Sequence, residues 1–535
     1  MPTLPFLLLL AATAMFACVA FNKLSGRLGV PALLAFLLLG MAFGSDGIFK
    51  IPFDNYAMAE QVCSFALIFI MFYGGFGTNW RAARPVAGRA ILLSTAGVVL
   101  TAFFAGLFCR LALGFPWLDS FLIGAVLGST DAASVFSILR ARNLALKENT
   151  ASLLEVESGS NDPCAYMLTA VLLTAMQGGV SVADVLRLVL AQVGYGLAFG
   201  FGIALIASVL LKRLRFGAAG FDAVFVVAVA LLAYAAPSVL GGNGYLSVYI
   251  AGIILGNSEI RNKSTLVPFF DGVTGLMQML LFFLLGLLCL PSQMPKVVLP
   301  ALAIALFLTL IARPAAVFLL LAPIKSSLGQ KLVVSWSGLR GAASIVFAVM
   351  AVISPAMTNY DIFHIVFLVV LFSISLQGSL LPAVSRRLKM IDANADVRKT
   401  FTDYSDEAPV QFIQFTVTPQ HPWAGRAVRE LILPPGTVLV TLQRSGTQLA
   451  PNGDTVLEAG DLLILCAMAP GDLQGVHLTE RQLEADDLTH GTRIRDLPRR
   501  EGALIVLVQR GETFLIPNGD TALMPGDVLV IYNGE

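Results

Sequence analysis

The sequence contains few charged residues and lacks the cysteine spacings of redox and zinc-binding proteins. Asp, Glu, Lys and Arg make up 13% of its 535 residues, whereas an average soluble protein has about 25%. Its six cysteines include no Cys-x-x-Cys pair, and five of them lie in apolar runs. Cysteine in such runs packs as a small hydrophobic residue. We therefore expect neither a disulfide nor a metal site built from cysteine.

The sequence also lacks the basic start of a secretory signal peptide, because no Lys or Arg precedes the first apolar run, MPTLPFLLLL. We expect this run to be kept as a first spanning helix. The chain is 57% hydrophobic, which predicts a polytopic α-helical membrane protein. At about 20 residues per span, we expect thirteen spans, near residues 4–22, 31–46, 58–76, 90–111, 117–139, 151–176, 184–211, 221–239, 246–257, 267–290, 297–321, 331–353 and 361–382.

The distribution of basic residues predicts how the chain is oriented in the membrane. Alternate connections are rich in Arg and Lys, for example those with Arg81 and Arg84, Lys212 and Arg213, and Arg386 and Arg387. Basic connections face the cytoplasm. We therefore expect the N-terminus outside and the C-terminus in the cytoplasm, which fits an odd number of spans.

From about residue 395 the composition becomes charged and rich in turn residues, which predicts a soluble cytoplasmic region. This region repeats itself at a constant offset of 66 residues: Arg444 recurs as Arg510, and Pro-Asn-Gly-Asp at 451–454 recurs at 517–520. A constant offset indicates two copies of one small α+β unit. The expected domains are a transmembrane part, a linker and two modules, at residues 1–390, 391–408, 409–474 and 475–535.

The stretch Glu-Ser-Gly-Ser-Asn-Asp-Pro at 157–163 places two carboxylates inside an apolar run. A carboxylate at membrane depth is costly, so Glu157 and Asp162 must face a protein interior or a water-filled cavity and find partners there. Ion transport is the first hypothesis for such residues. A carboxylate buried in a structural ion pair is the alternative.

Two further charges are predicted at the same depth. Asp131, Asp162 and Arg340 each lie nine or ten residues from the cytoplasmic end of their predicted span. At about 1.5 Å per residue this is about 14–15 Å, which is half of an apolar core about 30 Å thick. The three charged residues are therefore expected to share the middle of the membrane.

Asp131 and Arg340 both lie in stretches of small residues, GSTDAAS at 128–134 and SGLRGAAS at 337–344. If spans one to six and eight to thirteen form two halves, each stretch falls in the fifth span of its half. Paired interruptions of this kind are typical of secondary transporters built from inverted repeats, whose site lies between the two breaks. Close helix packing through small residues is the alternative for either stretch alone.

The helical spacing predicts a cation site at these residues. Ser158 and Asp162 are four residues apart and share one face of a helix. Their oxygens, together with those of Thr130 and Asp131, are expected to bind one monovalent cation.

Other charges near this site are expected to have structural roles. Glu157 and Arg340 have opposite charges, and we expect a buried pair that joins two helices. Because Asn161 is neutral, Asp162 is the only acid of its dipeptide and holds either one proton or one cation. Competition between the two ions predicts exchange that is one for one and electroneutral.

At these residues the chain resembles the monovalent cation:proton antiporter family, in particular the bacterial Na⁺(K⁺)/H⁺ antiporters of the NhaP type. The resemblance covers about residues 4–390 and is carried by Thr-Asp at 130–131, the stretch at 157–163 and Gly-Leu-Arg-Gly-Ala at 338–342. It implies a bacterial inner-membrane homodimer with thirteen spans, inverted repeats, interrupted helices at spans five and twelve, and elevator-like alternating access.

The resemblance also implies roles for single residues. Asp162 would be the principal carboxylate for the cation and the proton, and three residues would help to coordinate the cation: Thr130, Asp131 and Ser158. Three others would hold the arrangement together: Asn161, Glu157 and Arg340.

One position departs from the pattern of the family, and the soluble region adds a second resemblance. Relatives often carry an acid where this chain has Tyr73, which favours K⁺ over Na⁺. Both 66-residue copies resemble the C-terminal half of the regulator-of-K⁺-conductance module (TrkA-C), which again favours K⁺. No Gly-x-Gly-x-x-Gly occurs in this region, so we expect no NAD gating. A nucleotide or cyclic dinucleotide bound by the paired modules is a weaker hypothesis.

The leading interpretation is a K⁺/H⁺ antiporter regulated by its tandem modules. It is not an enzyme, needs no cofactor for transport and has no nucleic-acid partner. A Na⁺/H⁺ antiporter is the alternative within the same class. A regulated cation channel is the alternative from another class, although no Thr-Val-Gly-Tyr-Gly filter is present. A membrane sensor that moves little ion is a third interpretation.

Overall fold

The computed structural model of the chain separates into two compact units, Met1–Ser405 and Asp406–Glu535. It describes residues 5, 9, 12–21, 32–142, 144–178, 181–213, 220–258, 260, 263–324, 326–356, 358, 360–392, 410–434, 437–444, 447–449, 451–468, 477–483, 493–496, 503–510, 513–515 and 517–533. Nearly all of the predicted linker at 391–408 lies outside these ranges, as do the ends of both predicted modules.

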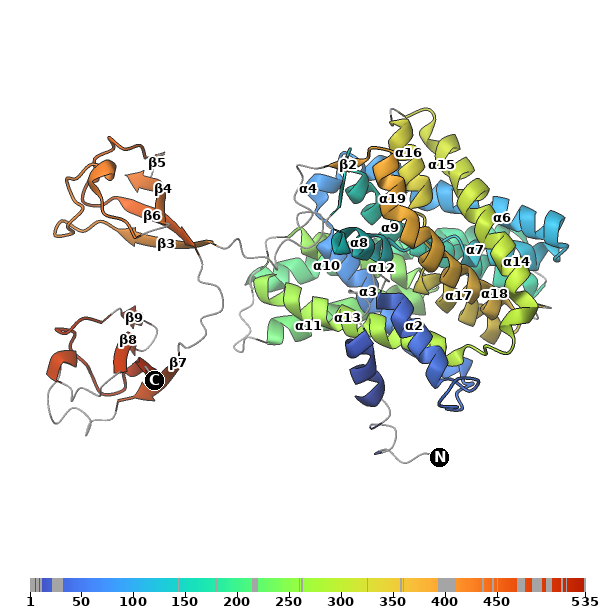
Figure 1. The fold of residues 1–535 in the computed structure, drawn as a ribbon, viewed down its shortest axis with the longest axis horizontal. Coiled ribbons are helices and arrows are strands. Elements are labelled where there is room, and N and C mark those ends of the chain that lie inside the picture. Colours follow the sequence, from blue (N-terminus) through green and yellow to red (C-terminus); the bar gives the residue numbers. More distant parts are fainter. Residues whose placement is uncertain are drawn as a thin grey trace. The chain divides into compact units, whose positions relative to one another are not determined.

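The first unit is a bundle of apolar helices (Figure 1). Its α-helices after residue 31 are α2 (Ala32–Phe43), α3 (Tyr56–Gly77), α4 (Trp80–Ala83), α5 (Ala87–Leu92), α6 (Val98–Leu113), α7 (Trp117–Val126), α8 (Ala132–Ala141), α9 (Thr150–Met176), α10 (Val182–Arg213), α11 (Phe221–Val239), α12 (Gly244–Gly256), α13 (Lys263–Leu288), α14 (Met294–Phe307), α15 (Arg313–Leu321), α16 (Leu328–Trp336), α17 (Ala342–Ile353), α18 (Ile362–Phe372) and α19 (Ser379–Arg387).

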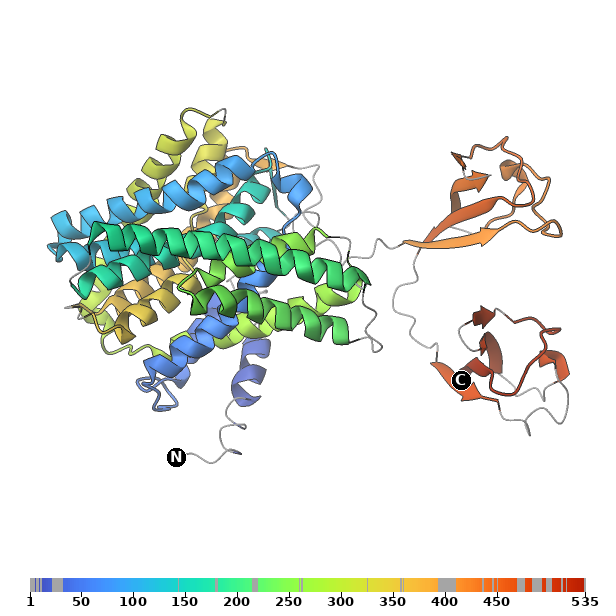
Figure 2. The same ribbon diagram turned by 180° about the vertical axis from the view of Figure 1, so that it is seen from behind.

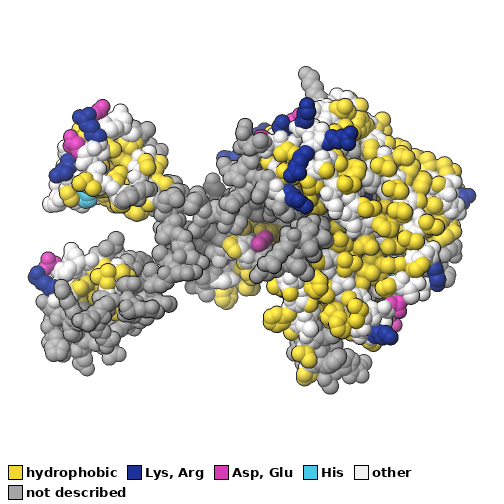
Figure 3. Space-filling model, viewed as in Figure 1, with side chains coloured by type: hydrophobic (Ala, Val, Ile, Leu, Met, Phe, Trp, Pro, Cys, Tyr) yellow, Lys and Arg dark blue, Asp and Glu magenta, His cyan; other side chains and the backbone are white. Residues whose placement is uncertain are grey.

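The helices have the length and composition of membrane spans. Among the described residues, seven helices are long and apolar enough to cross a membrane, and five shorter ones are also apolar. The long helix α10 lies beside α11 at the surface of the bundle (Figure 2). On the face of the bundle shown in Figure 3, hydrophobic side chains cover most of the described surface, and Lys and Arg lie mainly towards its margins. The chain is therefore a multi-pass membrane protein, and the total of thirteen spans stays a prediction.

Three helices contain π-helical segments, which are often found at functional sites. The segment η1 (Leu93–Gly97) joins α5 to α6, η2 (Leu308–Ala312) joins α14 to α15, and η3 (Ser373–Gly378) joins α18 to α19. The helix that contains η1 packs against the helix that contains η2. The segment η2 ends directly before Arg313, and η3 contains Gln377.

Two non-helical segments of the described bundle, called breaks from here on, lie within apolar sequence. The first break, residues 127–131, separates α7 from α8, and the second, residues 337–341, separates α16 from α17. Both breaks consist mainly of Gly, Ser and polar residues inside otherwise apolar sequence. Glycine weakens a helix, and Ser and Asp compete for its backbone hydrogen bonds. The composition of both stretches therefore accounts for the position of the breaks.

A short antiparallel pair of strands joins the end of the first unit to the connection between α8 and α9. Strands β1 (Ala145–Leu146) and β2 (Ile391–Asp392) pair with Ala145 opposite Asp392, and the Lys147 amide donates to the Met390 carbonyl at 2.9 Å. The buried Met390 side chain packs against Gly329 of α16. This joint therefore contacts both interrupted helices at the point where the chain leaves the bundle.

The second unit contains two four-stranded antiparallel sheets with the same strand order. The first sheet has the order β3-β6-β4-β5 and the second β7-β10-β8-β9. Their strands are β3 (Val410–Thr416), β4 (Thr437–Arg444), β5 (Thr447–Leu449), β6 (Leu462–Met468), β7 (His477–Gln482), β8 (Ala503–Arg510), β9 (Thr513–Leu515) and β10 (Val528–Asn533). In their described residues both copies contain strands and a short 3₁₀ turn but none of the α-helix expected for an α+β unit.

The repeat of 66 residues seen in the sequence is also a repeat of contacts. Arg444 donates two hydrogen bonds to the buried Asp461 carboxylate at 2.8 and 2.7 Å. Arg510 makes the same two bonds to Asp527 at 2.8 and 2.7 Å. Each acid directly precedes the central strand of its sheet. The arginine therefore holds this strand against its neighbour in both copies.

The Arg444–Asp461 pair predicts a pH-dependent stability of the first sheet. The Arg444 hydrogen bonds lower the pKa of Asp461, so the pair stabilises the folded state above the usual carboxyl pKa of about 4, and this contribution is lost as pH falls through the lowered folded value. We expect Arg444→Met to cost about 2 kcal/mol at pH 7 and less below pH 4. Hydrogen exchange of β6 in the full chain, corrected for intrinsic rates, measures the difference.

The second copy is the internal control for this measurement. Strand β10 keeps its Arg510–Asp527 pair, so its protection should not change. Equal loss of protection in β6 and β10, or equal loss at both pH values, would contradict the assignment.

Candidate functional site

The two helix breaks lie against each other in the middle of the bundle. The Asp131 amide donates to the Leu339 carbonyl at 2.8 Å, which links one break to the other through the backbone. Gly341 leaves room for this contact, because a Cβ atom there would lie 2.6 Å from the Asp131 Oδ2 atom. The sequence prediction placed these stretches at the same depth, and the structure brings them into contact.

Asp131 also holds the start of α8. Its Oδ1 accepts from the Ser134 amide at 3.2 Å and its Oδ2 from the Ser134 hydroxyl at 2.5 Å. This is the pattern of an N-cap, in which an acidic side chain satisfies amides at a helix start. Asp131 therefore has a structural task in addition to the ion-binding task predicted for it.

Arg340 does not contact Glu157, so the predicted pairing of these two residues is wrong. Its Nη1 instead donates to the carbonyls of Gly128 and Ser129, at 3.1 and 2.8 Å. These carbonyls follow the end of α7, where a positive charge is favourable. Arg340 is 2% exposed. Arg340, a residue of the second break, thus satisfies backbone carbonyls of the first break. Neither motif shows this role alone.

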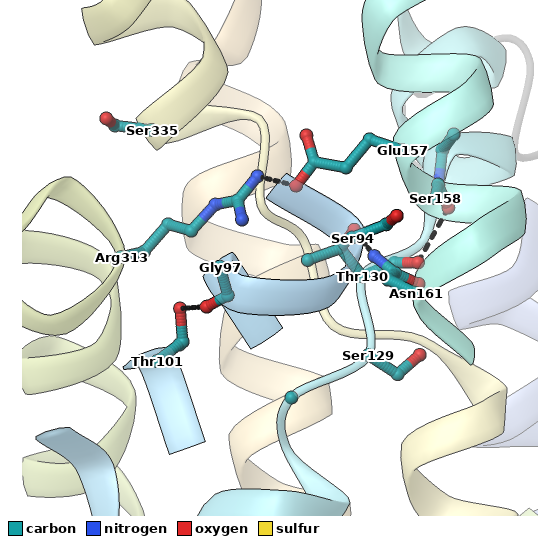
Figure 4. A network of polar contacts seen from close by, with 12 residues as sticks. Ser94, Gly97, Thr101, Ser129, Thr130, Glu157, Ser158, Asn161, Arg313 and Ser335 are labelled. Atoms are coloured by element: carbon teal, nitrogen blue, oxygen red, sulfur yellow. Dashed lines mark hydrogen bonds and ion pairs between the residues drawn. The ribbon is translucent and has the colours of Figure 1, made fainter. Parts of the chain in front are cut away.

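The partner of Glu157 is Arg313 at the start of α15, and the two side chains form a buried ion pair (Figure 4). The segment η2 ends at the residue before Arg313. Arg313 also packs against Gly338, where a Cβ atom would lie 3.0 Å from its Nε. Sequence reasoning missed Arg313, although a lone Arg within the predicted span 297–321 was a visible signal.

Helix α9 connects to the first break through four hydrogen bonds made by three of its residues. The Ser158 hydroxyl donates to the Thr130 carbonyl at 2.7 Å and accepts from the Ala132 amide at 2.8 Å. The Asn161 amide donates to the Thr130 hydroxyl, and the Ser129 hydroxyl donates to the Asp162 carboxylate. Figure 4 shows Ser158 and Asn161 on the side of α9 that faces this break.

These contacts hold the break beside the site predicted for the ion. Ser158 bridges two backbone groups of the break, and Asn161 is buried against Thr130. Ser129, which sequence reasoning missed, is the hydrogen-bond partner of Asp162. The sequence offered one signal for this role, because Ser129 directly precedes the predicted site residues Thr130 and Asp131.

The second break is held by a separate network around Gln377 of η3. The Ser373 hydroxyl donates to the Gln377 side-chain oxygen at 2.9 Å, and the Arg340 amide donates to Ser373 at 3.0 Å. The Gln377 amide donates to the Trp336 carbonyl at the end of α16 at 2.5 Å, and the Trp336 indole returns a bond to the Gln377 carbonyl at 3.0 Å. Gln377 therefore fastens the end of α16.

A cavity of about 500 Å³ reaches the first break and α9. Asp131, Asp162 and Ser158 line it, whereas Glu157, Asn161 and Arg340 are not among its lining residues. Asp131 and Asp162 are also only partly buried. Of the residues predicted to bind the ion, Thr130 lines the cavity as well. The cavity thus contacts the carboxylates of Asp131 and Asp162, whereas Glu157 and Arg340 lie outside its lining.

The chemistry of the lining residues suits a hard cation and a proton. Carboxylate, hydroxyl and carbonyl oxygens replace the water shell of such cations, and a carboxylate in a narrow cavity exchanges a proton with water. Among the residues that the structure describes, no basic side chain lines the cavity. The site can therefore bind one small cation or one proton at Asp162 without a fixed positive charge beside it.

Two family models match the chain. The model "Sodium/hydrogen exchanger, transmembrane" matches residues 11–387. The model "TrkA-C domain" matches twice, at residues 412–469 and 478–532. The two TrkA-C matches correspond to the two sheets of the second unit.

Individual relatives agree with these matches. The chain is 35% identical over 461 residues to "K(+)/H(+) antiporter NhaP2" of Shewanella sp. (strain ANA-3), covering 85% of this chain and 80% of that protein. It is 35% identical over 451 residues to "K(+)/H(+) antiporter NhaP" of Alkalimonas amylolytica, covering 83% and 78%. The solved sodium proton antiporter MjNhaP1 from Methanocaldococcus jannaschii at pH 8 matches with a TM-score of 0.62 and 26% identity, over 71% of this chain and 99% of that one.

The buried ion pair predicts an asymmetric response to substitution. Arg313→Gln leaves the Glu157 carboxylate buried without its partner, which typically costs about 3–5 kcal/mol. Glu157→Gln/Arg313→Gln removes both charges, so we expect it to regain part of that loss. Thermal unfolding of the detergent-solubilised full chain measures the order of stability: wild type, then the double variant, then Arg313→Gln.

The exposed Arg187 of α10 provides a matched control, because Arg187→Gln removes one guanidinium from the surface. This control should unfold at the wild-type temperature. A double variant that is no more stable than Arg313→Gln would contradict the direct pairing.

Proposed function

The chain belongs to the sodium/hydrogen exchanger family, and from this premise we propose that it exchanges K⁺ for H⁺ across the bacterial cytoplasmic membrane. It is a cation:proton antiporter and not an enzyme, and the exchange requires no cofactor. The observation that carries the proposal is the position of Asp162 at a cavity that other carboxylates also line. The choice of K⁺ is supported by relatives that bear the name K⁺/H⁺ antiporter.

Asp162 is the proposed carrier of both ions. Its carboxylate holds one proton or takes part in holding one K⁺, with further oxygens from Asp131, Thr130 and Ser158. The competition makes the exchange one for one and electroneutral. A transport rate or reversal point in proteoliposomes that changes with membrane voltage would contradict this stoichiometry.

The proposed transport cycle needs a fold with two halves. We assign thirteen spans with inverted repeats, interrupted at the fifth and twelfth, and alternating access of the elevator type. The π-helical segments support this symmetry, because η1 and η2 fall in the fourth span of each proposed half. The resemblance adds a homodimer. The basic connections place the N-terminus outside and the modules in the cytoplasm.

Na⁺ is the second candidate for the transported cation. The chain is 28% identical over 344 residues to "Na(+)/H(+) antiporter 1" of M. jannaschii, covering 61% of this chain and 79% of that protein. Comparing K⁺ with Na⁺ in the assay below decides between the two.

The exchange proposal predicts that one substitution abolishes transport. We expect Asp162→Asn to remove K⁺-driven proton movement from proteoliposomes, since a neutral amide can neither take up a proton nor balance a cation. The loss should be at least about 100-fold, because the carrier group itself is removed. Acidification or alkalinisation of the vesicle lumen, followed with a trapped pH dye, measures it.

Asp222→Asn is the matched control, because Asp222 lies in the first turn of α11 and does not line the cavity. Its transport should equal that of wild type. Transport that persists in Asp162→Asn would place the carrier group elsewhere.

Regulation by the modules has a proposed route through the β1–β2 joint. Strand β2 is the last described segment before the second unit, and it pairs with the connection that follows α8. A force or displacement from the modules would reach the first interrupted helix there, and α16 through Met390. A nucleotide or cyclic dinucleotide is the proposed regulatory ligand, and its binding to the full chain by calorimetry would test it.

Locking the joint should uncouple the modules from transport. We expect the Ala145→Cys/Asp392→Cys variant, oxidised to a disulfide, to transport at the same rate with and without residues 406–535. The reduced form should show a difference between these two lengths of chain. A difference that persists after oxidation would exclude this route, and no difference in either form would contradict regulation by the modules.

A further inference from the structure

Helix α13 carries a second polar face into the cavity, opposite the site at Asp162. Asp271, Thr274 and Gln278 occupy positions i, i+3 and i+7 of this helix, which share one face. All three residues line the cavity. The remainder of α13 is apolar apart from its first turn, which contains Lys263. The polar residues of α13 thus lie on one stripe that faces the cavity.

Asp271 is a carboxylate within a membrane-spanning helix, and such residues are usually functional. Its Oδ1 accepts a hydrogen bond from the Tyr73 hydroxyl of α3 at 3.3 Å. Tyr73 also lines the cavity. Asp271 therefore lies where α3 and α13 pack against each other beside the cavity, and it is exposed there rather than buried in an ion pair.

Thr274 provides a separate indication of a ligand. Its side chain is 8% exposed, and its hydroxyl oxygen has no hydrogen-bond partner among the residues that the structure describes. A buried hydroxyl without a partner is costly unless water or a ligand satisfies it. It lies one turn from Asp271 and lines the same cavity. Carboxylate, phenol and hydroxyl oxygens thus converge near one place.

The charge of the whole cavity favours a cation at this place. Its described lining residues include four acids, Asp131, Glu155, Asp162 and Asp271, and no Lys, Arg or His. A cleft lined by one sign of charge raises the local concentration of the opposite ion. Asp271 is eight residues from the start of α13, whereas Asp162 is twelve from the start of α9. These separations correspond to about 12 and 18 Å of rise.

We propose that Asp271, with the Tyr73 and Thr274 hydroxyls, forms a second monovalent-cation site that loads the cation before it reaches Asp162. This inference rests on the proposed function, since it assigns the route of the same cation. The basic connections place the starts of α9 and α13 on the cytoplasmic side, so Asp271 lies nearer to that side than Asp162 does. Asp271 thus sets the apparent affinity for cytoplasmic K⁺, and Asp162 carries out the exchange.

The test is the K⁺ dependence of exchange in proteoliposomes, measured for Asp271→Asn in the full chain. We expect the half-saturating K⁺ concentration to rise roughly five- to tenfold, because local accumulation of the cation is lost. The maximal rate should stay within about twofold of wild type, because Asp162 remains. Asp271→Glu, which keeps the charge, should remain close to wild type. Asp222→Asn is again the matched control for removal of a carboxylate.

A relocated carboxylate separates a binding role from a structural one. Tyr73→Asp/Asp271→Asn moves the acid from α13 to the neighbouring position on α3, whose side chain now hydrogen-bonds to Asp271. We expect this double variant to recover most of the K⁺ affinity lost in Asp271→Asn. A merely structural Asp271 would not be rescued by an acid on α3.

The outcomes separate this inference from the proposed function. A wild-type protein without K⁺-driven exchange contradicts the proposed function itself. An active wild type with unchanged half-saturation in Asp271→Asn overturns the second site alone. A loss of maximal rate with unchanged half-saturation, or a double variant no better than Asp271→Asn, also overturns it. Thermal unfolding of each variant identifies any that fail to fold, and Asp271→Glu then serves as the comparison.

Discussion

The structure depends on satisfying two helix breaks inside an apolar bundle. Within a membrane no water is available to the backbone groups that a break exposes, so protein groups must satisfy them. Here each break supplies partners for the other, through the Asp131 amide, the Leu339 carbonyl and the Arg340 guanidinium. Ser158 adds both a donor and an acceptor from α9. The proposed ion site depends on these contacts, because they hold the first break beside a cavity.

The charges of the bundle divide into two groups with different surroundings. Glu157, Arg313 and Arg340 are almost fully buried and bind one another or the backbone. Asp131, Asp162 and Asp271 line the cavity. A buried pair fixes the packing of its helices but has no access to an ion, while a carboxylate at a cavity can exchange its proton or cation. This separation lets the bundle keep a rigid frame around groups that change their charge.

The soluble unit contains the same arginine–aspartate pair in both of its copies. In each copy an arginine on one strand binds the carboxylate that precedes the central strand, and the two pairs have equal bond lengths. Each sheet also has a hydrophobic core of its own. Each copy therefore has a core of its own, separate from that of the other copy.

Much of the fold could be predicted from the sequence, because local composition determines where spans, breaks and repeats lie. Hydrophobic runs predict spans, Gly and Ser runs predict breaks, and the constant offset of 66 residues predicts two similar modules. The motifs at Thr130-Asp131 and Asp162 identify the family, which the family models confirm. The hydrogen-bond and ion-pair partners of the polar side chains could not be predicted from the sequence. Glu157 pairs with Arg313 and not Arg340, Ser129 donates a hydrogen bond to Asp162, and Tyr73 donates one to Asp271. These contacts join helices that are distant in sequence, and only helix packing determines which side chains face each other.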